Sequence, residues 1–247
     1  MTSISLYIFC GLVAGSLIGV AGIGGVVLVP LLIYLAGADV HSSVAAAIFS
    51  FLVSGTIGTF IYSRRGAIDW PLLKKLTLGA VPGTLMGSVI LFYIEAQTLR
   101  LFIAALIIFS ALREILFNIQ NTSPDVPSLS YNKYAFIGFV TGLLSALSGT
   151  GGPLILIPIL SYLAMPTLTS IGLAQVIQVP VALFATFGNA WNNLIDWQMA
   201  GSISIGVAFG SFLGGQVSKI IPVKRIKQFV AFLLLASGIL MLSTILF

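Results

Sequence analysis

The tetrapeptide Gly22-Ile23-Gly24-Gly25 lies in the middle of an apolar run that extends from Ile4 to Gly37. As one α-helix this run would be about 50 Å long, whereas a bilayer core of about 30 Å is crossed by about 20 residues. The run is therefore too long for one membrane span and too short for two. Glycine lacks a Cβ, so this cluster permits a sharp turn and the close approach of another group. We expect the run to break at these glycines, inside a membrane.

A second cluster, Ser148-Gly149-Thr150-Gly151-Gly152, lies inside another apolar run, from Tyr134 to Leu163. A shift of 127 residues places Gly22, Gly24 and Gly25 on Gly149, Gly151 and Gly152. Without a gap, the same shift relates Gly11, Gly15, Ser43, Gly79, Gly83, Gly87 and Ser110 to Gly138, Gly142, Ser170, Gly206, Gly210, Gly214 and Ser237, and it relates the Ile-Asp-Trp triplets at 68–70 and 195–197. This register predicts an N-terminal repeat (1–117), a linker (118–133) and a C-terminal repeat (134–247) in a single membrane domain.

The composition is that of a membrane protein. Hydrophobic residues make up 58% of the chain and charged residues 7%, whereas soluble proteins carry about 25% charged residues. Apolar blocks recur at about 4–36, 40–62, 72–93, 99–118, 134–163, 168–189, 198–218 and 226–246. We therefore expect an all-α polytopic membrane protein. We also expect its N-terminal segment to be retained, because no cleavage site follows the first apolar run.

The basic residues indicate how the two halves are oriented, because loops rich in lysine and arginine stay in the cytoplasm. In the first half the positive loop is 64–75, and its repeat partner 191–202 contains Asp196 but no basic residue. In the second half the positive loop is 219–227, and the charged residues of its partner 92–100 are Glu95 and Arg100. Because the positive loop changes place between the halves, the sequence predicts two inverted repeats.

Inverted halves each cross the membrane an odd number of times. We expect three transmembrane helices in each half, after a glycine-broken block that forms a re-entrant hairpin or two short paired helices. Both termini would lie outside a cell (inner) membrane, with the linker inside. The formal net charge of +5 follows from these loops, so we expect no nucleic-acid partner. Inverted repeats with broken helices are typical of transporters that bind substrate near the midplane.

The glycine clusters are the candidate binding elements. A helix that begins inside a membrane offers free N–H donors and partial positive charge, so two facing N-termini could hold one small anion. Nearby hydroxyls and amides would add donors. The predicted substrate-binding residues are Gly22, Gly24, Gly25, Ser148, Gly149, Thr150, Gly151, Gly152, Gln175 and Gln178. The alternative is that glycines only allow close helix packing, as we expect for Gly11, Gly15, Gly83 and Gly87.

Other polar residues favour structural roles. Asp69 and Asp196 precede helix starts and are expected to be N-caps. His41 has no second histidine nearby to share a metal, and Ser148 with a lone histidine is a poor match to a serine protease. We therefore expect no enzyme activity, no cofactor and no metal. No acidic residue lies in the middle of an apolar block, so we also expect no side-chain proton relay.

The glycine-rich blocks carry a resemblance to a known family. Residues 11–25 read Gly-Leu-Val-Ala-Gly-Ser-Leu-Ile-Gly-Val-Ala-Gly-Ile-Gly-Gly, and the repeat ends in Ser-Gly-Thr-Gly-Gly-Pro153. With the duplication and the chain length, this pattern resembles the TauE/SafE sulfite-exporter family over essentially the whole chain. The resemblance implies transport of small sulfur-containing anions, such as sulfite and sulfoacetate, across the bacterial inner membrane. Val26 stands where the second half has Pro153, so the two half-sites are not identical.

The hypothesis from sequence is a secondary transporter or exporter of a small anion, sulfite or an organosulfonate, bound at facing helix N-termini near the membrane midplane. Its partners would be that anion and the lipid bilayer, and its oligomeric state stays open. The alternative class is a passive anion channel or a non-transporting membrane scaffold. A scaffold would not need two facing glycine breaks.

Overall fold

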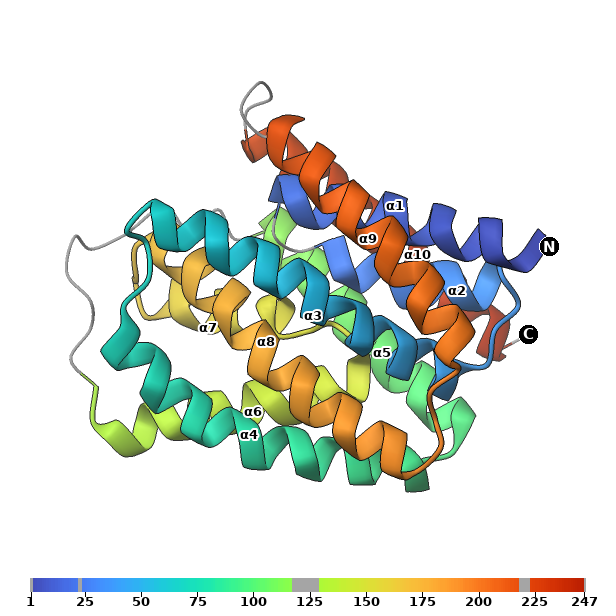
Figure 1. Cartoon of the computed structure of the whole chain (residues 1–247), viewed down its shortest axis with the longest axis horizontal. Helices are drawn as coiled ribbons and strands as arrows, with labels where there is room; N and C mark the ends of the chain where they lie inside the picture. The colour runs from blue at the N-terminus through green and yellow to red at the C-terminus, as the bar shows by residue number, and fades with distance from the viewer. Residues whose placement is uncertain (1, 22–23, 117–128, 218–222, 247) are drawn as a thin grey trace.

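The computed structural model describes residues 2–21, 24–116, 129–217 and 223–246, and the regular structure within these ranges is all helical (Figure 1). Gly22 and most of the linker lie outside the described residues. The first half contains α1 (Thr2–Ala21), the short 3-10 helix η1 (Gly24–Val27), α2 (Leu28–Tyr34), α3 (Val40–Arg64), α4 (Trp70–Tyr93) and α5 (Ala96–Leu116). The second half contains α6 (Tyr131–Ser148), α7 (Pro153–Tyr162), α8 (Thr167–Trp191), α9 (Trp197–Val217) and α10 (Val223–Leu246).

Both long apolar blocks are broken at their glycine clusters, as predicted. In the first block α1 ends at Ala21, and a new helical segment begins with η1. In the second block α6 ends at Ser148 and is capped by Gly149, which has a left-handed backbone (φ 66°) and donates its N–H to the Ser145 carbonyl. Gly151 and Gly152 also have positive φ angles, 73° and 112°, which residues with a Cβ adopt only under strain. The chain turns here, and α7 then begins with a proline, which suits the first turn of a helix.

Four helices in the described ranges are long and apolar enough to cross a membrane: α3, α4, α8 and the part of α5 from Ala96 to Arg113. Aspartates fix where several helices begin, because their side chains accept hydrogen bonds from free N–H groups of the first turn. Asp69 accepts from the Leu72 N–H at 2.9 Å, and Asp196 accepts from the Met199 N–H at 3.0 Å. These contacts confirm the two N-caps predicted from the sequence.

Glycines pack α4 directly against the main chain of α6, because a Cβ at these positions would collide with the facing helix. The contacts join Gly79, Gly83 and Gly87 of α4 to Ala135, Phe139 and Leu143 of α6. Their counterparts join Gly206, Gly210 and Gly214 of α9 to Ile8, Leu12 and Ser16 of α1. The shift of 127 residues converts one set into the other. The packing role predicted for Gly83 and Gly87 is confirmed, and it is repeated in both halves.

The helices run between two ends of the bundle (Figure 1). Since Gly55 faces Val179 and Gly58 faces Gln175, α3 and α8 are antiparallel. The terminal end holds both chain termini, the start of α3 and the end of α8; the linker end is the opposite one, where α5 ends and α6 begins. The first broken block, α1 to α2, begins and finishes at the terminal end. The second, α6 to α7, begins and finishes at the linker end.

Candidate functional site

The two glycine breaks meet in the middle of the bundle, where α3 crosses α8. Gly25 and Gly151 both contact the ring of Phe51, which lies near the middle of its 25-residue helix. A Cβ on Gly25 would lie 2.7 Å from Phe51 Cζ, and one on Gly151 would lie 2.7 Å from Phe51 Cδ2. The carbonyl oxygen of Thr150 is 3.6 Å from the same Gly25 Cβ position. Backbone from both halves therefore converges on one point inside the protein.

The second break presents three consecutive backbone N–H groups. Across the described ranges, no carbonyl accepts from the N–H of Thr150, Gly151 or Gly152, and all three residues are buried. The Gly152 carbonyl accepts from Ile155 and Leu156 at 3.1 and 2.9 Å, so the start of α7 uses its acceptors and leaves its donors unused. A buried N–H without an acceptor costs about 1–3 kcal/mol. Three such donors side by side are the expected feature of a site where a ligand supplies the acceptor.

Two polar side chains face this break with unused hydrogen-bonding capacity. The Nε2 of Gln178 lies 3.0 Å from the Gly151 Cβ position and donates to Ser54 Oγ at 3.1 Å. In the part of the chain that the structure describes, Gln178 Oε1 and Ser145 Oγ are buried and have no partner. Ser145 Oγ is 3.9 Å from the Gly152 Cβ position. The start of α7 is thus surrounded by uncharged donors and acceptors from α3, α6 and α8.

The hydroxyl groups of Ser148 and Thr150 form a local chain. Ser148 Oγ donates to the Leu144 carbonyl at 2.7 Å, and the two hydroxyl oxygens are 2.9 Å apart. Since the Ser148 hydrogen is used by that carbonyl, Thr150 donates to Ser148. Both hydroxyl hydrogens are occupied in this state, so the chain stabilises the turn and leaves the backbone N–H groups as the free donors.

The remaining predicted residues lie around this point. Gln175 is buried between α3 and α8, with its side-chain oxygen against Gly58, toward the linker end. A Cβ on Gly149 would meet Val29 and Val44, so the surroundings of this glycine are apolar. Gly24 is adjacent to Gly25 in η1. Gly22 lies outside the described residues, and its part in the site stays a prediction.

Sequence reasoning did not select three residues that the fold brings to the breaks: Phe51, Ser54 and Ser145. A signal for Phe51 was present, because the shift of 127 residues places it on Gln178. Ser145 lies three residues before Ser148, and therefore on the same face of α6. The pairing of Ser54 with Gln178 depends on how α3 crosses α8, which no local pattern indicates.

The site is enclosed and uncharged. Phe51 is 0% exposed, Gln178 2% and Thr150 3%, so these side chains have almost no contact with the surroundings of the protein. Charged side chains with a described position lie near helix ends, and the buried polar residues of the described interior are serines, threonines, glutamines and an asparagine. Any ligand here would be held by dipoles rather than by a full opposite charge.

A family model described as "Sulfite exporter TauE/SafE" matches residues 7–241. The chain belongs to the TauE/SafE family. Curated relatives include a "Probable membrane transporter protein" of Xylella fastidiosa, strain 9a5c, which is 25% identical and covers 87% of this chain and 85% of its own length. The "Probable membrane transporter protein YdhB" of Bacillus subtilis is 21% identical and covers 92% and 96%. No solved structure matches the chain significantly. Family and relatives together identify a membrane transporter.

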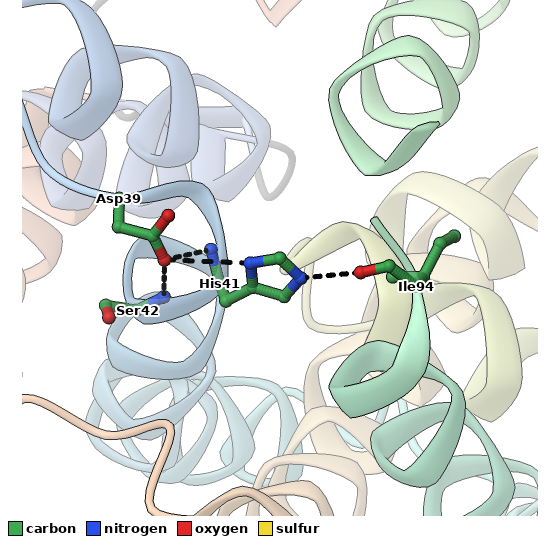
Figure 2. A network of polar contacts seen from close by, with 4 residues as sticks. All are labelled: Asp39, His41, Ser42 and Ile94. Atoms are coloured by element: carbon green, nitrogen blue, oxygen red, sulfur yellow. Dashed lines mark hydrogen bonds and ion pairs between the residues drawn. The ribbon is translucent and has the colours of Figure 1, made fainter. Parts of the chain in front are cut away.

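This TauE/SafE member has a second polar cluster at the terminal end (Figure 2). Asp39 Oδ2 accepts from the backbone N–H groups of His41 and Ser42, at 2.9 and 3.2 Å. The Nε2 of His41 is 2.9 Å from the carbonyl oxygen of Ile94, the C-cap residue of α4. Because a carbonyl only accepts, Nε2 carries the hydrogen, and the ring ties the start of α3 to the end of α4. The cluster therefore combines an N-cap of α3 with a hydrogen bond that joins α3 to the end of α4.

We expect the substitution His41→Ala to lower stability without changing transport. The lost hydrogen bond to Ile94 is worth about 1 kcal/mol, which thermal unfolding of the detergent-solubilised protein should report as a lower Tm. Ser42→Ala is the matched control, since only the backbone of Ser42 takes part. Unchanged Tm with lost transport would instead give His41 a functional role.

Proposed function

We propose that this transporter carries a small monovalent oxyanion, such as hydrogen sulfite or an organosulfonate, through the point where the two glycine breaks meet. The observation that carries the proposal is the row of three buried N–H donors at Thr150, Gly151 and Gly152. Oxyanions offer several acceptor lone pairs to such a row, and the N-terminus of α7 adds partial positive charge. The family name supports a sulfur oxyanion as the substrate class.

An uncharged site suits a carrier of monovalent anions. The cost of moving an ion out of water rises with the square of its charge, and the described interior offers no lysine or arginine to offset it. A monoanion can be held by N–H dipoles and the Gln178 amide, whereas a dianion would be held too weakly. Binding through dipoles also stays loose enough for the anion to leave again.

We further propose that the two halves are inverted repeats that alternate access to this point. The support is the matched helix contacts, in which α4 meets α6 as α9 meets α1, and the two broken blocks that return to opposite ends. Three single crossings in each half would then give the halves opposite directions. Rocking of one half against the other around a central site is the usual mechanism of such folds.

The charges of the two ends suggest which end faces the cytoplasm. The linker end carries Arg64, Arg65, Lys74, Lys75 and Lys133, with Asp69. The terminal end carries Asp39, Glu95 and Asp196, with Arg100. Basic loops stay inside, so we propose that the linker end is cytoplasmic and that both termini are outside the inner membrane.

Cysteine labelling would test this topology. Glu95→Cys and Arg65→Cys place exposed thiols at the two ends, while the native Cys10 is buried. A membrane-impermeant maleimide added to intact cells should label Glu95→Cys, and it should label Arg65→Cys only after the membrane is opened. If intact cells label Arg65→Cys and leave Glu95→Cys unlabelled, the orientation is the reverse of the one proposed.

Flux into liposomes would test the function. Purified protein should give saturable uptake of radiolabelled sulfite or sulfoacetate, stimulated by unlabelled anion inside, and little uptake of sulfate. Uptake that rises linearly with concentration and ignores the internal anion would favour a passive channel. Absence of flux for sulfite, sulfate, thiosulfate and sulfoacetate alike would contradict both transport mechanisms.

A further inference from the structure

The ring of Phe51 fills the space between the two glycine breaks. Its outer atoms Cζ and Cε1 lie 2.7 and 2.8 Å from the Cβ position of Gly25, and its inner atoms Cδ2 and Cγ lie 2.7 and 3.1 Å from that of Gly151. Contacts this short leave no room for a side chain at either glycine. Both breaks are therefore packed against the Phe51 ring.

Phe51 is also a large side chain at the point where the two breaks meet. It is fully buried, and it heads the largest fully buried side chains of the described residues. An anion that contacts the backbone of Gly25 and that of Gly151 at once would have to occupy the position of the ring. The ring must therefore leave this position before one anion can bridge the two breaks.

We propose that Phe51 is the plug that separates the two half-sites of the transport path, so that its displacement lets an anion pass from one break to the other. This inference rests on the proposed function. With the ring in place, each break is a separate half-site. With the ring displaced, the space that it fills between Gly25 and Gly151 becomes open to an anion.

The two halves are not equivalent at this position. The repeat counterpart of Phe51 is Gln178, so one half contributes an apolar ring and the other a polar amide. Gln178 Nε2 donates to Ser54 Oγ, one helical turn along α3 from Phe51. An anion at the second break would accept the other hydrogen of this amide while the first stays with Ser54 Oγ. Gln178 would then link a bound anion to α3, the helix that carries Phe51.

The test measures the uptake of radiolabelled sulfite into liposomes. It asks whether uptake saturates and whether unlabelled sulfite inside accelerates it. Wild-type protein should show saturable uptake that internal unlabelled sulfite accelerates. Phe51→Ala should convert this to a leak that does not saturate and ignores internal sulfite. We expect the leak at low sulfite to exceed wild-type uptake at least about tenfold, which corresponds to a barrier lower by about 1.4 kcal/mol.

Two further variants keep the test decisive. Leu91→Ala truncates another fully buried side chain, on α4, and should retain saturable uptake, which separates the plug from general core damage. Phe51→Leu keeps most of the volume but is too short to reach Gly25, so it should show an intermediate leak. This variant provides the test if Phe51→Ala does not fold. Saturable, accelerated uptake in both Phe51 variants would overturn the plug and leave the proposed function intact. Absence of uptake in wild-type protein would overturn the proposed function itself.

Discussion

Gly152→Val and Gly25→Val are each expected to reduce anion flux at least about 100-fold, the loss that a misplacement of about 1 Å at a site can cause. The two variants act through different physics. Gly152 has a φ angle of 112°, which valine adopts only under strain, so the turn that presents the N–H row would change. At Gly25 a Cβ would lie 2.7 Å from the Phe51 ring, so the ring or the break must shift.

Both variants should still insert and fold, because the atoms nearest to each added Cβ belong to side chains, which can shift, and not to the main chain of a facing helix. Gly201→Val is the matched control, since nothing lies within 4 Å of its Cβ position, and its flux should equal that of wild type. Flux and protein level should be measured on the same liposome preparation. Near-normal flux in both break variants would leave close packing as the explanation of these glycines.

Gly83→Val is expected to reduce the amount of folded protein, whereas the variants at the breaks should fold and lose flux. A Cβ on Gly83 would collide with the main chain of α6 at Phe139, and a main chain cannot move aside as a side chain can. Overpacking in a core costs about 1–3 kcal/mol, and we expect the upper part of this range or more, against a total stability of about 5–15 kcal/mol. The measurement is Tm in detergent, together with the yield of monodisperse protein.

The repeat supplies an internal check on that result. Gly210 of α9 meets Leu12 of α1 as Gly83 meets Phe139, so Gly210→Val should lower Tm by a similar amount. The two interfaces are distinct, so the double variant should lose about the sum of both free energies. A wild-type Tm in either single variant would show that the helices can separate without cost, contrary to the packing described above.

The sequence was sufficient for the features that depend on spacing along one chain segment. The length of the run from Ile4 to Gly37 requires a break, and three glycines in four residues locate it. Asp69 and Asp196 cap their helices because a carboxylate before an apolar run can reach the free N–H groups. Glycines at intervals of four, such as Gly83 and Gly87, mark one face of a helix and thus an interface.

The centre of the site depends on contacts that no local pattern encodes. The bond between Ser54 and Gln178 joins residues 124 positions apart, and it exists because α3 crosses α8 at that level. Phe51 is an unremarkable apolar residue within an apolar helix until the fold inserts its ring between Gly25 and Gly151. Ser148 and Thr150 were predicted to add donors, but their hydroxyl hydrogens are used by the local chain that ends at Leu144.

The most direct test of the central claim is to locate a bound anion. Selenite has the shape and charge of sulfite, and its selenium gives an anomalous X-ray signal. In crystals of the protein soaked with selenite, we expect a selenium peak beside the Gln178 amide, placed so that the selenite oxygens accept from the N–H groups of Thr150, Gly151 and Gly152. The peak should be lost in Gly152→Val. A strong peak elsewhere in the membrane interior, with none at this break, would contradict the account.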